Sequence, residues 1–172
     1  MDFLKFATDR YSVRKFTDKH LEQDVIDKIL ECGHVAPTGC NYQPQRILVL
    51  NTDENLEKLK RCTKCHFDAP TAMIICYNKA ESWVRRYDGA MTAPVDASIV
   101  MTHMMLMAHS LGVGTCIVMA LDPIKTREEF NIPENYDIST ILVMGYPHPD
   151  DVPAHFHTEF RPKDEVIFFE KF

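Results

Sequence analysis

Hydrophobic and polar positions along the chain follow two periods, and together these predict a mixture of helices and strands. Apolar residues three and four positions apart predict a helix over the segment from Leu21 to Leu30. Short continuous apolar runs predict buried strands at 46–50, 72–77, 115–119 and 140–145. Further helices are expected at 2–8, at 55–61, and from a cap at Asp122 to Pro133.

The longest apolar segment runs from Pro94 to Leu111 and is apolar on nearly all sides, which predicts a helix at the centre of the domain. Its histidines, His103 and His109, do not share a helix face at a spacing of six, so neither is expected to be a ligand. Because a helix this apolar must be covered by other elements, we expect a layered α+β fold. The methionines at helical spacing indicate core packing more than a metal or cofactor site: Met101, Met104, Met105 and Met107.

Composition and charge narrow the class of protein. The 172 residues carry 25 acidic and 19 basic side chains, a net charge of −6, and no repeat or linker divides them, so we expect one domain over 1–172. An acidic chain is not expected to bind nucleic acid, which requires a basic face. The apolar runs fall short of the roughly 20 residues that span a bilayer, and no export signal is apparent, so we expect a cytoplasmic protein without a membrane span.

The clamp segment, Arg10–Phe16, carries the strongest local chemistry. In an extended segment, residues two apart face the same side, so Arg10, Ser12 and Arg14 would present two guanidinium groups and a hydroxyl together. This donor set suits a phosphate group. Taken alone, a solvated basic strand end is at least as good an interpretation.

Two more motifs follow along the chain. In the amide loop, Ala36–Pro44, the amides of Asn41 and Gln43 offer donors and acceptors suited to the uracil-like edge of a flavin or to a nucleobase. By itself, this loop is more typical of a turn between a helix and a strand. The glycines Gly112 and Gly114 do not form a dinucleotide fingerprint, because the third glycine is missing at Ile117.

In this order, the motifs resemble the nitroreductase family of FMN-dependent oxidoreductases, and the resemblance spans nearly the whole chain. The family's Arg-x-Ser-x-Arg/Lys-x-Phe motif is matched by Arg10, Ser12, Arg14 and Phe16. Its Ala-Pro-Ser-x-x-Asn-x-Gln-Pro motif is matched by Ala36, Pro37, Thr38, Asn41, Gln43 and Pro44. Its Gly-Leu-Gly-Thr-Cys and Gly-Tyr-Pro motifs are matched by 112–116 and 145–147.

The resemblance implies a mostly antiparallel sheet flanked by helices around the long apolar helix. It also implies a homodimer with two FMN molecules at the subunit interface. The implied contacts to the phosphate and ribityl end are Arg10, Tyr11, Ser12, Arg14 and the late Arg161. Pro37, Thr38, Asn41 and Gln43 would reach the flavin of the partner subunit, and the backbone of Ile117, Val118 and Met119 would lie along its ring near N5.

The implied reaction is a two-step shuttle. NADH or NADPH gives a hydride to the flavin and leaves, and a nitroaromatic, a quinone or a similar small acceptor then takes the electrons. The cofactor carries the chemistry, so we assign no catalytic acid, base or nucleophile. Ala120 stands where the family often has glycine, and the chain is short for the family, which leaves the choice of acceptor open. A flavin-binding or flavin-sensing protein without turnover is the alternative.

The six cysteines are expected to be reduced thiols. Cys62, Cys65 and His66 match the haem-attachment pattern, but haem attachment requires export. A zinc site would need a second pair of ligands. A thioredoxin-like cysteine pair would begin a helix, whereas this pair follows one. We favour a thiol pair without a metal, and keep a metal or haem protein and a thiol-reactive patch beside the flavin as alternatives. The aromatic and charged tail, Phe156–Phe172, has no partner of its own and is expected to pack on another subunit.

Overall fold

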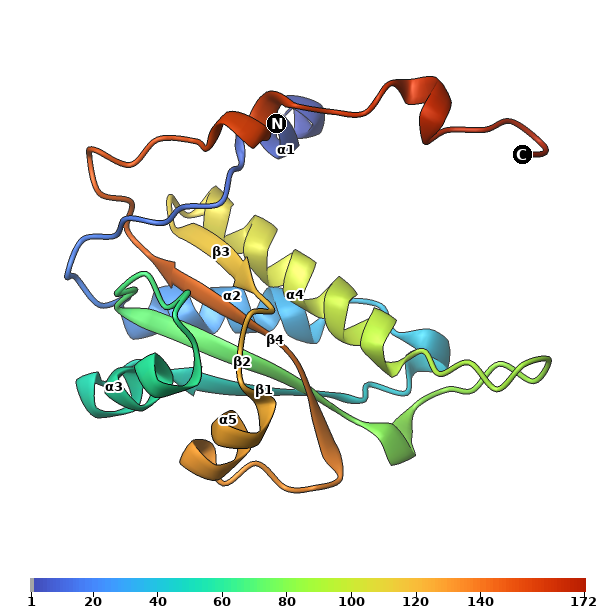
Figure 1. Cartoon of the computed structure of the whole chain (residues 1–172), viewed down its shortest axis with the longest axis horizontal. Coiled ribbons are helices and arrows are strands. Elements are labelled where there is room, and N and C mark those ends of the chain that lie inside the picture. The colour runs from blue at the N-terminus through green and yellow to red at the C-terminus, as the bar shows by residue number, and fades with distance from the viewer. Residues whose placement is uncertain (1) are drawn as a thin grey trace.

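A four-stranded antiparallel sheet organises the chain (Figure 1). The structure, a computed structural model, describes residues 2–172. The strands pair in the order β1-β2-β4-β3, and each neighbouring pair is antiparallel. Their bounds are β1 (Gln45–Leu50), β2 (Thr71–Asn78), β3 (Gly114–Val118) and β4 (Tyr136–Gly145). The expected α+β class with an antiparallel sheet is therefore confirmed.

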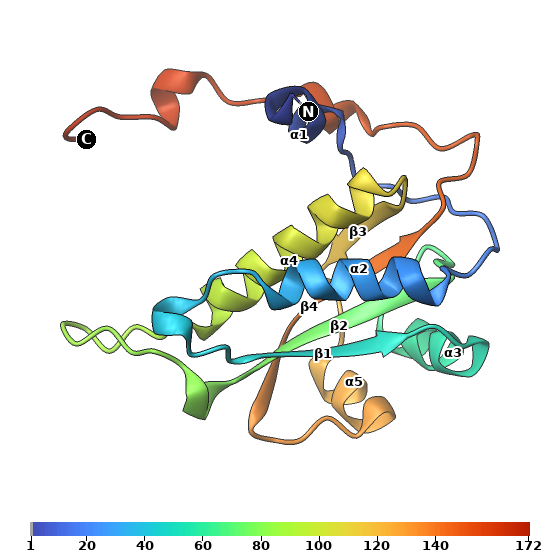
Figure 2. The same cartoon turned by 180° about the vertical axis from the view of Figure 1, so that it is seen from behind.

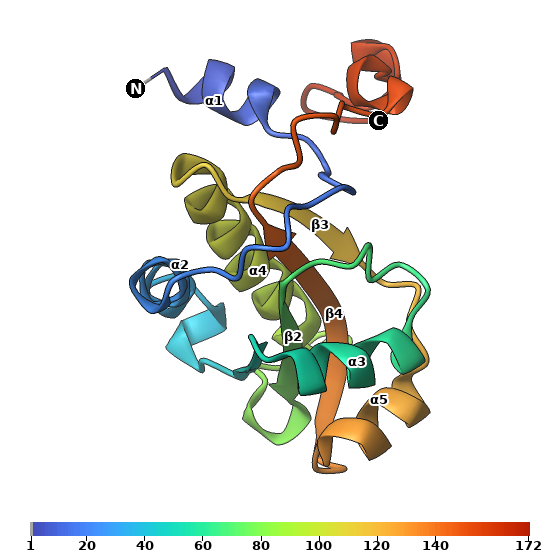
Figure 3. The ribbon, with the colours of Figure 1, turned by 90° about the vertical axis from the view of Figure 1, so that its left-hand side faces the viewer.

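Helices cover both faces of this sheet (Figure 3). Side chains alternate between the two faces along each strand, and both faces carry apolar side chains that the helices bury. On β2, Met73 and Ile75 pack against α2 (Gln23–His34) and α4 (Ala93–Ser110). Ile74 and Cys76 point the other way, into the core beneath α3 (Asp53–Cys62) and α5 (Pro123–Phe130). The result is a three-layer sandwich with two apolar cores.

The long apolar helix α4 lies in the α2 layer, and its two sides differ in burial. Val100 and Met104 are completely buried against the sheet and α2, so the prediction that the methionines serve the core is confirmed. The outer side is left uncovered by the chain, contrary to the expected enclosure, and Val95 is 58% exposed. A shallow outer pocket of about 340 Å³ is lined by Val95, Ser98, Ile99, Thr102 and His103. Within the described part of the chain, α4 and the other helices are too short or too polar to cross a membrane.

Both ends of the chain lie beyond the same side of the sandwich (Figures 1 and 2). The short helix α1 (Phe3–Asp9) leads into the clamp segment. The C-terminal arm, 152–172, contains only two 3₁₀ turns, η3 (His155–Thr158) and η4 (Lys163–Glu165), and extends away from the body. Its aromatic side chains are largely uncovered, with Phe160 at 83% and Phe169 at 85% exposure.

Three features differ from the sequence-based expectation. Strand β4 begins at Tyr136 rather than at 140, because the first residues of β4 continue the ladder with the end of β2 past a bulge at Ile75/Cys76. Helix α5 ends at Phe130, before Pro133, because Asn131 takes a left-handed conformation (φ 51°) that stops a helix. A hairpin, Trp83–Thr92, projects from the start of α4 (Figure 2).

Candidate functional site

The clamp segment is held in place by its backbone. Val13 N donates to Thr115 O on β3 at 3.0 Å, and Thr17 N donates to Tyr146 O at 2.9 Å. On the same side, Asp151 Oδ1 accepts hydrogen bonds from Arg14 N and Lys15 N at 3.2 and 2.9 Å. The segment therefore pairs with β3 at Ser12 and Val13 and lies between β3 and the chain that follows β4. At Arg14 and Lys15 it departs from the predicted extended form, because two consecutive N–H groups point to one oxygen.

Four predicted cofactor contacts, Arg10, Tyr11, Ser12 and Arg14, line one pocket of about 290 Å³. Arg14 Nη1 donates to Ser12 O at 3.1 Å, which fixes the guanidinium beside the hydroxyl residue. The arm supplies the other wall, with Ala154, Phe156, His157 and Phe160. No sequence pattern points to His157, whose ring centroid lies 6.1 Å from that of Tyr11, because only the fold brings the arm to the clamp segment.

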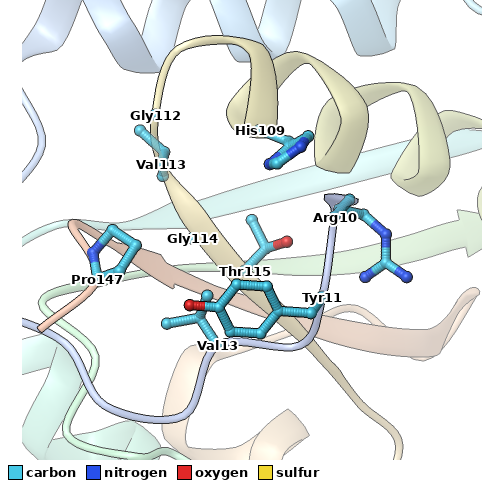
Figure 4. Close-up of a pocket in the computed structure, with 9 residues that line it drawn as sticks. All are labelled: Arg10, Tyr11, Val13, His109, Gly112, Val113, Gly114, Thr115 and Pro147. Atoms are coloured by element: carbon cyan, nitrogen blue, oxygen red, sulfur yellow. The ribbon is translucent and has the colours of Figure 1, made fainter. Parts of the chain in front are cut away.

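A neighbouring pocket of about 190 Å³ shares Arg10 and Tyr11 and opens against the end of α4 (Figure 4). His109 lines it from the last turn of α4, beside Thr115 of β3. Burial and, after it, the positive charge of Arg10 lower the pKa of His109. The imidazole is thus held neutral in a pocket that already contains a cation. No local pattern points to His109 as a pocket residue, because its spacing from His103 bears only on a shared metal site.

The packing around Gly114 explains why this position of the motif is a glycine. A Cβ atom on Gly114 would lie 2.6, 2.8 and 2.9 Å from Cγ2, Cβ and Cγ1 of Val13. Val13 is 2% exposed and cannot move aside into solvent. The glycine therefore allows the clamp segment to lie directly against β3.

Two further titratable side chains surround the clamp segment. Burial raises the pKa of Tyr11, and the nearby negative charge of Asp151 raises it further. Burial also raises the pKa of the Cys116 thiol, against the opposing effects of Arg14 and Ser12. Both groups therefore stay protonated near neutral pH, and the guanidinium groups face no competing thiolate or phenolate.

The amide loop has a defined but unusual backbone. Cys40, Asn41 and Gln43 adopt left-handed conformations, with φ of 48°, 59° and 50°. Thr38 Oγ1 accepts a hydrogen bond from Gln43 N at 3.1 Å, and Gln43 Nε2 donates to Asn41 Oδ1 at 3.1 Å. The amides of Asn41 and Gln43 are thus locked together on the exposed surface, beside an exposed Pro37.

The amide loop and the clamp segment lie at opposite ends of α4. Gly39 of the loop contacts Asp96 in the first turn, whereas His109 in the last turn lines the pocket beside the clamp segment. Asp96 and His109 are thirteen helical positions apart, or about 20 Å along the helix axis. A single chain therefore does not bring Asn41 and Gln43 to Arg10 and Arg14.

The remaining predicted contacts divide into near and distant ones. Ile117, Val118 and Met119 continue β3 past Thr115, and Ile117 and Met119 are 40% and 76% exposed, whereas Val118 is buried. Arg161 lies on the arm with its side chain 79% exposed and an ion pair to Glu165 at 3.6 Å. The clamp pocket is lined by its neighbour Phe160 and not by Arg161 itself.

The cysteine motif lies beside the end of β3. Helix α3 ends at Cys62, as predicted, so the thiol pair follows a helix instead of beginning one. All six cysteines are free thiols, and burial raises the pKa of Cys62. Thr63 Oγ1 donates to Ala120 O at 2.6 Å and ties the motif to the segment after Met119. Across residues 2–172, no three His, Cys, Asp or Glu side chains are grouped so as to hold a metal ion.

An antiparallel sheet between two helical layers, with the clamp segment at one end of a long apolar helix, defines a three-layer α+β protein, and comparison with known proteins gives the family. The nitroreductase family model matches residues 7–73 and 60–146, so the chain belongs to the nitroreductase family, as its motifs predict.

Solved structures and a relative agree with this assignment. A nitroreductase family protein from Clostridium difficile is 36% identical, with each chain covered completely and a TM-score of 0.93. An FMN-dependent nitroreductase from the same species is 26% identical, with 98% of this chain and 99% of the other covered and a TM-score of 0.80. A protein from Methanothermobacter thermautotrophicus, provisionally named an NADH dehydrogenase/NAD(P)H nitroreductase, is 31% identical over 86% of this chain and 78% of its own length.

Proposed function

We propose that this FMN-dependent NAD(P)H oxidoreductase reduces small electron acceptors such as nitroaromatics and quinones. The observation that carries the proposal is the pocket in which Arg10, Ser12 and Arg14 meet on one backbone-held segment. Membership of the nitroreductase family and the FMN-dependent neighbour support the class of enzyme and its cofactor.

The donor chemistry of the pocket fits the phosphate end of FMN. Two guanidinium groups and a hydroxyl can share one phosphate dianion through charge-assisted hydrogen bonds. The neighbouring Tyr11 and Cys116 stay uncharged, so the pocket is positive overall. The paired amides of Asn41 and Gln43 suit the pyrimidine edge of a flavin ring.

When bound, FMN supplies the hydride chemistry, accepting two electrons from a nicotinamide and passing them on. Arg10, Ser12 and Arg14 bind and orient the phosphate end, and the exposed side of β3 at Ile117 and Met119 borders the space for the ring. The nicotinamide and the acceptor would use this space in turn. None of these residues is assigned a proton-transfer role.

We infer that two copies of the chain complete each site. The amide loop and the clamp segment lie at opposite ends of α4, so in a symmetric dimer the loop of one subunit can meet the clamp segment of the other. The uncovered outer side of α4 and the exposed aromatic arm are the apolar surfaces that such a dimer would bury.

The cofactor assignment is tested by titrating the apoprotein with FMN. Arg14→Ala should weaken FMN binding by about 1.5–3 kcal/mol, or roughly tenfold to 150-fold, because one charge-assisted contact is lost. Lys15→Ala is the matched control, since it removes one positive charge from the adjacent residue, which does not line the pocket, and should leave the affinity nearly unchanged. Equal FMN affinities for the two variants would contradict the clamp.

Turnover and the acceptor are tested separately. Rapid bleaching of the bound flavin on anaerobic mixing with NADH or NADPH supports the oxidoreductase, whereas no bleaching with either supports a flavin-binding protein without turnover. An anaerobic screen with nitrobenzoates and quinones then measures reoxidation. Failure of every nitroaromatic and quinone to reoxidise the flavin would refute the proposed acceptor class.

The shared site is tested by complementation. A subunit carrying Arg14→Ala is mixed, after unfolding and refolding, with a subunit carrying Asn41→Ala and Gln43→Ala. Each heterodimer then contains one intact site, formed by the wild-type clamp segment of one subunit and the wild-type loop of the other. Recovery of tight FMN binding in the mixture is expected, and no recovery would contradict a site shared in this way.

A further inference from the structure

A buried carboxylate stands directly behind the amide loop. Asp96 lies in the first turn of α4 and is 2% exposed. Its Oδ1 accepts a hydrogen bond from Gly39 N at 2.8 Å, and its Oδ2 accepts one from Thr92 Oγ1 at 2.9 Å. Each carboxylate oxygen thus receives a donor from a different segment. In residues 2–172, no lysine, arginine or histidine forms an ion pair with Asp96, so these donors and the positive end of α4 stabilise its charge.

The loop that Asp96 contacts needs an external anchor. Three of its residues, Cys40, Asn41 and Gln43, have left-handed backbones, and such conformations persist only when the surroundings fix them. The hydrogen bond to Gly39 N is made immediately before this strained run. Gly39 also lies very close to Thr92, since a Cβ atom at this position would be 2.7 Å from Thr92 Oγ1.

The second donor belongs to the base of the hairpin. Thr92 N donates to Trp83 O at 3.0 Å, which closes the hairpin, and Ala93 N donates to Ser82 Oγ at 3.0 Å. Asp96 therefore joins the amide loop, the hairpin and the start of α4 at one point. A carboxylate is suited to this junction because it only accepts hydrogen bonds, whereas an asparagine would present an NH₂ group to one of the two donors.

We propose that Asp96 is a positioning residue for the flavin ring: it holds the amide loop in the left-handed conformation that presents Asn41 and Gln43. This role rests on the proposed function for its connection to flavin. The hairpin is set by the same junction, so its exposed tip at Tyr87 keeps a fixed place relative to the loop.

The test compares two ligands that share a ring but differ in phosphate. Asp96→Asn should weaken FMN and riboflavin binding by the same factor, about tenfold, because the amide loop contacts only the ring. Arg14→Ala should weaken FMN and leave riboflavin nearly unaffected. Asp24→Asn is the matched control, since it removes a first-turn carboxylate from the neighbouring helix α2 and should change neither affinity.

A second pair of variants keeps the test valid if Asp96→Asn folds poorly. Thr92→Val removes the hydroxyl donor and should weaken both flavins, whereas Thr92→Ser keeps the hydroxyl and should restore binding. Amide hydrogen exchange at Gly39, Asn41 and Gln43 gives a readout without any flavin, and Thr92→Val should speed it.

The outcomes separate this proposal from the proposed function. Unchanged exchange in the loop, or faster exchange with unchanged riboflavin affinity, would overturn the role of Asp96. A loss confined to FMN would also overturn it, because the effect would then lie at the phosphate. Wild-type protein that binds neither FMN nor riboflavin would refute the proposed function, and with it the link from Asp96 to flavin.

Discussion

Replacing Gly114 by alanine tests how tightly the clamp segment lies against the sheet. The added methyl would lie 2.6–2.9 Å from three carbons of the Val13 side chain, inside normal contact distance. The backbone of Gly114 is not in the left-handed region, so the effect is one of packing alone. Since Val13 is buried and its N–H is bonded to Thr115 O, relief requires the clamp segment to shift away from β3.

The magnitude follows from overpacking. Inserting one methyl into a filled core costs typically 1–3 kcal/mol, so Gly114→Ala should lower the free energy of unfolding by about 2 kcal/mol. Val13→Ala removes two buried methyl groups and should also cost about 2 kcal/mol. In the double variant, two of the three close carbons, Cγ1 and Cγ2, are removed, and only the Cβ atom at 2.8 Å still meets the new methyl. Its total cost should therefore be about 2–3 kcal/mol, below the roughly 4 kcal/mol expected for independent sites.

Urea unfolding monitored by circular dichroism measures these three free energies, and FMN titration measures the effect on the clamp. Gly114→Ala should weaken FMN binding because Arg10, Ser12 and Arg14 move with the segment, and Val13→Ala in the same chain should recover part of the affinity. Additive losses of stability in the double variant, within about 0.5 kcal/mol, would refute the argument that Gly114 exists to admit Val13.

Three other predictions test separate parts of the structure. Because the pKa of His109 is lowered in the folded chain, the unfolded chain binds a proton more readily. The stability that His109 contributes should therefore be complete above its unfolded pKa of about 6.5 and be lost as the pH falls through the folded pKa. Measured by urea unfolding between pH 7.5 and about 5.5, the wild type should lose more stability than His109→Gln. Deleting 153–172 should convert the proposed dimer into monomers, as measured by light scattering, and a truncated dimer would show that the arm is dispensable. Cys62→Ser with Cys65→Ser should keep the fold and FMN binding, and loss of a bound metal or haem on substitution would contradict a metal-free thiol pair.

Much of the fold can be predicted from periodicity, because the residues that form it bury one face at a regular spacing. The strand predicted at 72–77 and the helix predicted from Leu21 to Leu30 are examples, and they appear in the structure as β2 (Thr71–Asn78) and α2 (Gln23–His34). The first part of β4 escaped because Tyr136 and Asp137 pair across a bulge with β2, a relation that local sequence does not encode. The hairpin at 83–92 escaped because it has no apolar run of its own.

The site divides in the same way. The clamp segment could be predicted because Arg10, Ser12 and Arg14 alternate within one short segment, so their meeting depends mainly on local geometry. The role of Asp96 could not be predicted, because it depends on a hydrogen bond from Gly39, which is 57 positions away in the sequence. In the proposed dimer, the amide loop would meet the clamp segment of a second copy of the chain, a relation that periodicity within one sequence does not describe.

The way in which the clamp segment is attached has an evolutionary consequence. Its hydrogen bonds with Thr115, His148 and Asp151 are all made by main-chain groups of the segment, and its one buried side chain is that of Val13. Substitutions at Arg10, Ser12 and Arg14 therefore alter what is bound with little effect on how the segment folds. A scaffold of this kind can exchange one anionic ligand for another through a few surface substitutions, each of them nearly neutral for stability.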